Sequence, residues 1–317
     1  AESSQPRCGF YSALCCFCYL QHCCTSSEPS CEMFRGNRGV VFLTCRHITD
    51  VSQLSATIPR PQRTGDIFFT LSESHLQFLP EDAFEGISIK NLTFDKATVD
   101  DFTAPHPNVF DTLNATMREV FFRGKSTLPV SWKALGEITA LETLKLEQQN
   151  VSLDRDWAEL PRGVKRFFIM KCNIISQEDN ALASFNDLEA FILSESDVES
   201  FSWALLPNPA PKLTTLRLVR NKLTEIPEGF TVDQFPALKA LHVEYNPITK
   251  WNEDTLTALK NHPKRPKLVI RQIHCNCSAE PLRHFPQDRL HGKCGSPEHL
   301  KGRRIAELSE SDLQCSA

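Results

Sequence analysis

The chain has 317 residues, of which 41% are hydrophobic and 23% are charged, and this length suits two compact domains or one elongated array. The formal net charge of −4 gives no global reason to expect nucleic acid as a partner, because nucleic-acid binders usually carry a clear basic excess. No segment reaches the roughly 18 uninterrupted apolar residues that a membrane-spanning helix needs.

Cysteine usage separates the two ends of the chain from its middle. Eight of the 13 cysteines fall between Cys8 and Cys45, four fall between Cys275 and Cys315, and Cys172 stands alone. This grouping predicts disulfide-bonded regions at both ends of a secreted chain or of a surface ectodomain. Four N-glycosylation sequons agree with an extracellular location: Asn91, Asn114, Asn150 and Asn276. The last of them lies beside a cysteine and is the weakest.

The first cysteines lie in and just after an apolar run at residues 9–20. Arg7 ahead of this run resembles the charge that precedes a signal peptide, but we interpret the run as part of a knotted cap and expect the chain to be a mature form. The group Cys15, Cys16, Cys18, His22, Cys23 and Cys24 could hold zinc in principle, although an oxidising compartment favours disulfides. Eight cysteines permit 105 pairings, which the sequence leaves open.

Residues 213–230 carry the pattern that organises the chain. Leu216 and Leu218 alternate with outward residues, as in a short strand with one buried face. Asn221 can satisfy the backbone groups of a tight turn from inside it, and Leu223 with Ile226 returns the chain beneath the strand. One such turn cannot close its own core, so neighbouring turns must stack.

Comparable frames begin at Asp66, Ile89, Met117, Leu141, Val164, Leu188, Leu213 and Leu238. They are 23, 28, 24, 23, 24, 25 and 25 residues apart, and the longest interval contains a proline-punctuated loop at residues 104–108. Phenylalanine replaces leucine in several frames, and we predict that these rings fill the core: Phe69, Phe84, Phe94, Phe122, Phe167, Phe185, Phe191, Phe230 and Phe235. Cys172 takes the asparagine position of its frame and is predicted to be a buried free thiol.

The frames resemble leucine-rich repeats, and both ends resemble the caps of extracellular leucine-rich-repeat proteins. At the C-terminal end the resemblance rests on Cys275, Cys277, Cys294 and Cys315, which follow Asn246-Pro-Ile248 and Trp251. It implies the disulfides Cys275–Cys294 and Cys277–Cys315. Residues 41–48 resemble the strand that opens the N-terminal cap, whose cysteine, here Cys45, closes a bridge to the preceding cluster.

This resemblance implies an α/β leucine-rich-repeat solenoid with a curved parallel sheet on the concave face, an irregular or short helical convex side, and disulfide caps at both ends. We expect an N-terminal region and cap at 1–65, about eight repeats at 66–250, and a C-terminal cap at 251–317. In repeat style and size the chain is also similar to arthropod proteins related to the non-catalytic repeat subunit of a secreted shrimp luciferase. That similarity transfers no function. Separately, we expect that the chain could serve as a non-catalytic subunit of an extracellular complex.

The sequence lacks the common catalytic motifs. It has no Gly-x-Ser-x-Gly elbow, no phosphate-binding glycine loop and no His-Glu-x-x-His, and it holds only 12 glycines. No histidine lies near Cys172 in the sequence to act as its base. We therefore predict a binding protein that is not an enzyme and that uses no cofactor or metal.

Two rows of outward residues are predicted on the concave face. The first row is Thr70, Thr93, Phe121, Lys145, Phe168, Ile192, Arg217 and His242, and the second is Ser72, Asp95, Arg123, Glu147, Met170, Ser194, Val219 and Glu244. In the middle of the rows, an apolar area of Phe121, Phe168, Met170, Ile192 and Val219 has Arg123, Lys145, Glu147 and Arg217 around it. Exposed apolar groups rimmed by charge mark protein interfaces, so we predict that this area binds another secreted or cell-surface protein. A frame shifted by one residue would instead place these side chains in the core.

A second candidate surface is basic. Residues 260–304 contain eleven Lys or Arg and three acidic residues, and the predicted anion-binding positions are Lys264, Arg265, Lys267, Arg303 and Arg304. Such a cap could bind a sulfated glycan, an anionic lipid or an acidic partner, which would make the chain a recognition or matrix protein. The alternative is a solvated basic surface without a ligand.

Overall fold

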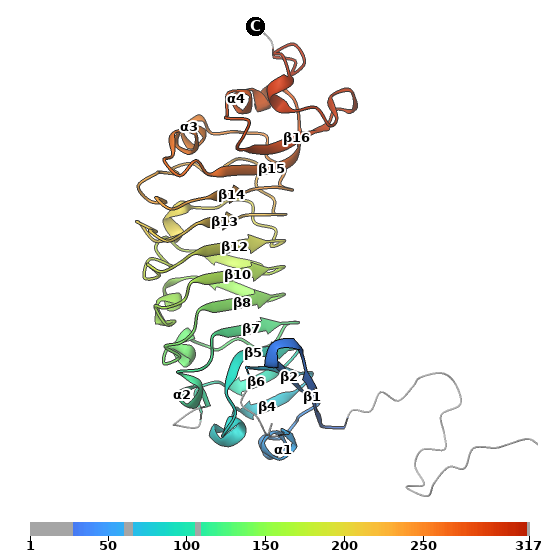
Figure 1. Ribbon diagram of the computed structural model, residues 1–317, viewed down its shortest axis with the longest axis vertical. Helices are drawn as coiled ribbons and strands as arrows, with labels where there is room; N and C mark the ends of the chain where they lie inside the picture. The colour runs from blue at the N-terminus through green and yellow to red at the C-terminus, as the bar shows by residue number, and fades with distance from the viewer. Residues whose placement is uncertain (1–27, 60–65, 105–108, 316–317) are drawn as a thin grey trace, which may run out of the picture.

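The computed structural model describes residues 28–59, 66–104 and 109–315. Most of the N-terminal cysteine group, including the candidate zinc ligands, lies outside these residues. In the described part, twelve strands form one sheet and lie one above another along the long axis of the molecule (Figure 1). Only the first pair, β1 and β2, is antiparallel, and all later neighbours are parallel. We call the outward side of this sheet the concave face.

The strands of the sheet are β1 (Ser30–Arg35), β2 (Val41–Arg46), β3 (Ile67–Ser72), β5 (Ile89–Asp95), β7 (Glu119–Arg123), β8 (Thr143–Glu147), β10 (Arg166–Met170), β12 (Ala190–Ser194), β13 (Thr215–Arg217), β14 (Ala240–His242), β15 (Lys267–His274) and β16 (Leu290–Ser296). Each of the eight predicted frames contributes one of the strands from β3 to β14. Inward residues such as Phe191, Leu216 and Leu241 pair across neighbouring strands and are fully buried. The predicted alternation of inward and outward residues is therefore confirmed.

The return segments carry short elements. Two small parallel sheets consist of β4 (His75–Phe78) with β6 (Thr98–Asp101) and of β9 (Asn150–Leu153) with β11 (Asn173–Gln177). The α-helices are α1 (Val51–Thr57), α2 (Val109–Leu113), α3 (Glu253–Asn261) and α4 (Glu280–Arg283). The 3-10 helices are η1 (Asn37–Gly39), η2 (Glu81–Phe84), η3 (Trp132–Leu135), η4 (Arg155–Glu159), η5 (Trp203–Leu205), η6 (Cys277–Ala279), η7 (Glu298–Leu300) and η8 (Ile305–Glu307). This side is irregular and short-helical, as predicted.

Aromatic rings run through the core from repeat to repeat. The nine phenylalanines predicted to fill the core are all buried. Tryptophans join them, which the leucine and phenylalanine pattern did not predict. Trp157 packs edge-on against Trp132 at 5.4 Å and against Phe167 at 5.2 Å between ring centroids. Trp157 thus links rings of three successive repeats, so removing it weakens the stacking of repeats as well as the local core.

Buried asparagines tie successive turns together. The side-chain oxygen of Asn221 accepts hydrogen bonds from the backbone N–H groups of Ser196 and Val198, and its amide donates to the carbonyl of Leu193 at 2.9 Å. Asn246 repeats this arrangement one turn later and accepts from the N–H of Asn221 at 3.1 Å. These bonds satisfy turn groups that would otherwise be buried without partners, which is the role predicted for Asn221.

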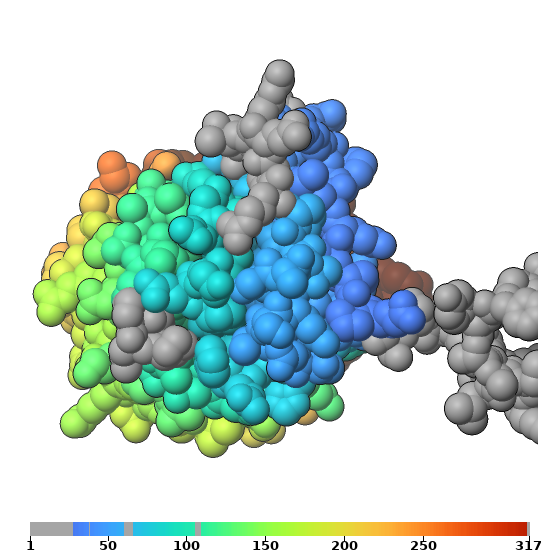
Figure 2. Space-filling view, turned by 90° about the horizontal axis from the view of Figure 1, so that it is seen from below, coloured from blue at the N-terminus to red at the C-terminus, as the bar shows by residue number. Residues whose placement is uncertain are grey.

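The N-terminal end of the core is closed by β1, β2 and α1. Cys45 forms a disulfide with Cys31, which confirms that this cysteine bonds to the preceding cluster. Figure 2, a view from this end, shows described residues of the N-terminal cap and the first repeats (blue to cyan) at the near surface. An end of a solenoid without such a cover would expose apolar core to water.

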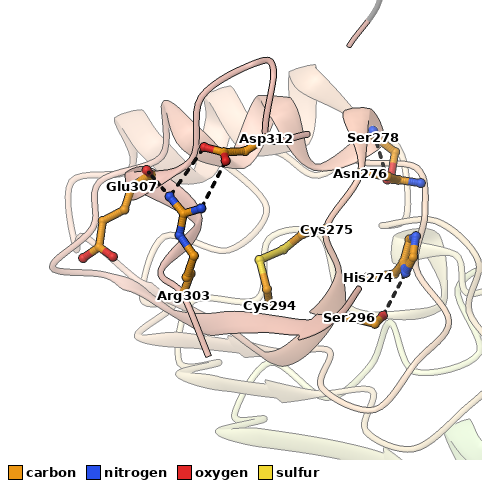
Figure 3. The surroundings of a disulfide bond; sticks show 9 residues. All are labelled: His274, Cys275, Asn276, Ser278, Cys294, Ser296, Arg303, Glu307 and Asp312. Carbon is orange, nitrogen blue, oxygen red and sulfur yellow. Dashed lines mark hydrogen bonds and ion pairs between the residues drawn. A yellow bond between two sulfur atoms is a disulfide. The ribbon is translucent and has the colours of Figure 1, made fainter. Parts of the chain in front are cut away.

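The C-terminal end is closed by two disulfides, Cys275–Cys294 and Cys277–Cys315, which are the pairs that the resemblance implied. Figure 3 shows the first of them beside β16. The buried guanidinium of Arg289 donates to the carbonyls of Leu259 and Lys260 at 3.2 and 2.8 Å, which ties the cap to the end of α3.

One hydrophobic core, from Val41 to Leu313, continues from cap to cap. The boundaries predicted after residues 65 and 250 therefore lie within a single packed body, and they stay predictions. Among the helices of the described residues, none combines the length and the apolar composition required to cross a bilayer.

Candidate functional site

The strand register brings the predicted concave residues together. From Phe121 to Arg217, the residues of the first row lie directly opposite one another on successive strands. Side chains directly opposite in a sheet are close enough to pack against each other. The alternative frame, in which these side chains would form the core, is wrong, because the core is built from their neighbours Phe122, Leu144 and Phe167.

We define the central patch as Phe121, Phe168, Met170, Ile192 and Val219. Phe168 pairs with Lys145 on one side and with Ile192 on the other, and all five members are partly exposed. The ammonium of Lys145 lies 5.9 Å from the ring centroid of Phe121 and 5.5 Å from that of Phe168. One cation thus bridges two rings, a geometry in which the ring faces attract the charge.

The cations beside the patch are neutralised by neighbouring acids. Lys145 forms a 2.8 Å ion pair with Glu119, and Arg123 forms one of 2.8 Å with Asp95. Lys171 forms an ion pair of 3.1 Å with Glu147, and the hydrogen bond and charge of Glu147 raise the pKa of Lys171. Paired charges present little net field, so the rings dominate the surface chemistry of the patch.

Arg217 differs from the other predicted binding cations. It is exposed at the C-terminal edge of the patch, and no acid lies within ion-pair distance of it among the described residues. Ile192, directly opposite Arg217 on β12, belongs to the patch. This arginine is therefore available to a partner without first breaking an ion pair.

The five predicted anion-binding residues do not form one surface. Lys267 and Arg304 line a groove at the C-terminal end of the concave face, whereas Lys264, Arg265 and Arg303 do not line it. Arg265 pairs with Asp288 at 2.7 Å, and Arg303 pairs with Asp312 at 3.1 Å (Figure 3).

Two cations of this groove, Arg271 and Lys293, were missed by the sequence analysis. They lie on β15 and β16, beyond the last repeat. Extending the outward row by one more strand past His242 would have led to residues 267–274.

The four sequon asparagines lie at different places. Asn91 is on the concave face of β5, opposite Phe68 and Glu119, whereas Asn114 and Asn150 are exposed outside the sheet. Asn276 caps η6, accepting from the N–H of Ser278 at 3.1 Å (Figure 3). Glycosylation at all four stays a prediction.

Metal and thiol chemistry find little support in the described residues. They contain no cluster of three or more His, Cys, Asp or Glu side chains placed to hold a metal ion. Cys172 is a buried free thiol, as predicted, and its Sγ lies 3.3 Å from the carbonyl oxygen of Met170. Burial raises the pKa of this thiol, which disfavours the reactive thiolate.

Comparisons with known proteins agree with the repeats and the cap. The model of the leucine rich repeat C-terminal domain matches residues 293–316. Toll-like receptor 2 of Cricetulus griseus is 30% identical over 141 residues, which are 40% of this chain and 16% of the receptor. The chain thus matches only a small part of that curated relative. These comparisons give no support to the resemblance to the luciferase subunit.

Two solved structures share the fold. A chain of the mouse RP105/MD-1 complex aligns with a TM-score of 0.55 at 15% identity, over 88% of this chain and 54% of that one. Human 5T4 (Wnt-activated inhibitory factor 1, trophoblast glycoprotein) aligns with a TM-score of 0.55 at 19% identity, over 92% of this chain and all of its own. Stacked repeats, disulfide pairs and these similarities lead to one conclusion: the chain is a leucine-rich-repeat protein with disulfide-bonded caps at both ends.

Proposed function

We propose that this chain is an extracellular binding protein that holds a protein partner on its central patch. The observation that carries the proposal is a patch of partly exposed apolar side chains whose neighbouring cations, apart from Arg217, are already paired. Aromatic groups in the middle of a surface, with charges at its rim, are the usual composition of protein interfaces. Three disulfides and four sequons support a location outside the cell.

The partner binds through contact with the rings and not through charge alone. Lys145 covers part of Phe121 and Phe168, so a partner either packs on the exposed ring edges or displaces this ammonium. Arg217 at the rim supplies one unpaired cation, which suits an acidic group at the edge of the partner. The mouse RP105/MD-1 structure is a complex of a protein of this fold, and it motivates a subunit role for this chain. In that role the chain is a non-catalytic subunit and not an enzyme.

Native mass spectrometry of the chain isolated from its own source tests the proposal. We expect a second polypeptide in a fixed ratio, because a stable interface of this kind survives gentle isolation. Oxidative footprinting of the complex should then show protection of Met170 and Phe168, while Ile175, which is 64% exposed on β11 outside the main sheet, should keep its reactivity. A chain that is always isolated alone would contradict the proposal, and so would protection of Ile175 without protection of Met170.

A further inference from the structure

The C-terminal end of the concave face holds a groove of about 810 Å³, a volume in the range of small-ligand sites. Four cations line it: Lys267 and Arg271 from β15, Lys293 from β16, and Arg304 from the loop before η8. No acidic residue lines it. The groove is separate from the central patch, which lies on β7 to β13.

Three of the four cations of the groove lack ion-pair partners among the described residues, in contrast to Arg123 and Lys145 beside the patch. In the described part of the chain, no carboxylate lies within 4.0 Å of Lys267, Arg271 or Lys293, and Arg304 has only Glu307 at 3.9 Å. Glu244, the acid at the end of β14, is engaged with His242, whose Nδ1 lies 3.2 Å from it. Although burial opposes ionisation, the hydrogen bond from His242 holds the pKa of Glu244 below its ordinary value. The positive field of the groove is therefore available to a ligand.

An irregularity of the strands shapes this surface. The pairing of β15 with β16 skips from Val269 to Arg271. The skipped Ile270, two positions after the inward Leu268, faces the core and is 2% exposed. Arg271 itself has a φ of 57°, and both it and the next residue, Gln272, are exposed. Opposite, a side chain on Gly292 would meet Ile270 at 2.3 Å, so glycine is required there. Bulges re-aim side chains, and here Arg271 and Gln272 are exposed in succession before Ile273 returns to the core.

The spacing of the charges indicates a ligand with several anionic groups. Lys293 on β16 is opposite Gln272 of β15. Gln272 lies five positions after Lys267, so the two lysines are about 16 Å apart along the strand direction. The cations are therefore spread along the groove instead of converging on one point. A single phosphate or carboxylate would contact only one end of it.

The uncharged lining favours a glycan over an acidic peptide. Gln272 offers an amide, His291 offers an imidazole, and Gln287 offers its side-chain oxygen, because its amide nitrogen donates to the carbonyl of Phe285. The half-exposed ring of Tyr245 closes one side, with the guanidinium of Arg220 over one of its faces at 4.9 Å. Amide and imidazole groups bond hydroxyls, and an aromatic face packs on a sugar ring. Besides Tyr245, the large apolar side chains that line the groove are Val269, which is partly buried, and Leu290, which is buried. A hollow of this kind admits an extended chain more readily than a flat bilayer.

We propose that this groove binds a sulfated oligosaccharide. The sulfates contact Lys267, Arg271, Lys293 and Arg304, and the sugar hydroxyls contact the amides. The site requires no covalent step, no metal and no other ligand. It is independent of the central patch, so it stands or falls separately from the proposed protein partner.

The test is calorimetric titration of the full chain with a sulfated hexasaccharide at about 0.15 M salt, where exposed charges are screened beyond about 8 Å. The variant Arg271→Gln with Lys293→Gln should weaken binding at least about tenfold, because two charge-assisted contacts are lost. The control variant Lys264→Gln with Arg265→Gln removes the same charge from the same cap, outside the groove, and should change affinity less than about twofold. Thermal unfolding of both variants checks that each is folded.

A panel of ligands distinguishes a site for a sulfated glycan from a site for an acidic peptide or an anionic lipid. The desulfated hexasaccharide, a hexaglutamate peptide and vesicles containing phosphatidylserine should all bind at least about tenfold more weakly than the sulfated sugar. Equal losses of affinity in the two variants would contradict binding in the groove and would indicate binding to the basic cap as a whole. A hexaglutamate peptide or vesicles that bind as tightly as the sulfated sugar would overturn the assignment to a glycan, as would a wild-type chain that binds none of the sugars.

Discussion

The central stretch of the concave face, from β7 to β12, and its C-terminal stretch, from β14 to β16, share one ladder of strands but balance their charges differently. In the central stretch, Lys145 and Arg123 each form an ion pair with an acid on a neighbouring strand, and the rings of the central patch lie beside them. In the C-terminal stretch, Arg271 is opposite Gly292 and Lys293 is opposite Gln272. The backbone of the repeat thus determines where side chains lie, and the partners across the strands determine whether a surface binds through rings or through charge.

The largest expected effect comes from breaking the frame beneath the central stretch. Phe167 and Phe168 are adjacent, but Phe167 is fully buried between rings whereas Phe168 faces outward. Phe167→Ala should lower the free energy of unfolding by about 3–5 kcal/mol, because it leaves a cavity in the core. Phe168→Ala should lower it by about 1 kcal/mol or less, the loss of a partly exposed ring with one cation contact. Urea unfolding of both variants measures this difference, and equal losses would contradict the assignment of faces.

A smaller effect is expected where the two stretches join. Asn221→Ala removes the acceptor of two backbone N–H groups and the donor to the carbonyl of Leu193, all in the buried turn. We expect the free energy of unfolding to fall by about 2–3 kcal/mol. Each buried polar group left without a partner costs about 1–3 kcal/mol, and some of these groups find new partners by rearranging. Asn173→Ala is the matched control, since the exposed Asn173 only donates to Asn150 at 3.1 Å, and it should lose less than about 1 kcal/mol in the same urea titration. A control as destabilised as Asn221→Ala would refute the role of the buried ladder.

The smallest effect concerns pH and the cap behind the groove. Hydrogen bonds from Ser309 and Arg303 lower the pKa of Asp312 to about 2. Because an unfolded aspartate titrates near about 3.9, the ionised form favours the folded state above that pH, and this contribution is lost as pH falls toward 2. Asp312→Asn should therefore lower Tm at pH 7 and reduce the fall in Tm between pH 4 and pH 2. Asp233→Asn, a change at an exposed acid outside the cap, should leave the profile unaltered. Parallel acid profiles for wild type and Asp312→Asn would contradict this account.

Much of the frame was predictable because alternation in a strand is a local property. Leu216, Leu218 and Asn221 specify one turn, and the other frames follow at nearly constant spacing. The outward row from Thr70 to His242 could therefore be predicted from the sequence. The disulfides at the C-terminal end followed from resemblance, and the structure contains them.

The groove could not be predicted in the same way, because it depends on pairing beyond the repeats. The residues around Arg271 give no sequence signal that Ile270 is skipped in the pairing of β15 with β16. The neutralisation of Lys145 by Glu119 likewise requires knowledge of which residues are opposite across two strands. The tryptophans of the core were missed because Trp132, Trp157 and Trp203 lie in 3-10 helices of the return segments, where the spacing is irregular.

The most direct test of the central patch is the affinity of the chain for the partner that travels with it, measured for two double variants. Phe168→Ala with Ile192→Ala removes two neighbouring patch side chains, and we expect at least about a hundredfold weaker binding, as for the loss of central interface anchors. Val130→Ala with Ile175→Ala removes two exposed apolar side chains away from the concave face, at 103% and 64% exposure, and should leave affinity within about twofold. Unchanged binding by the patch variant, with wild-type thermal stability, would contradict the claim that this patch holds the partner.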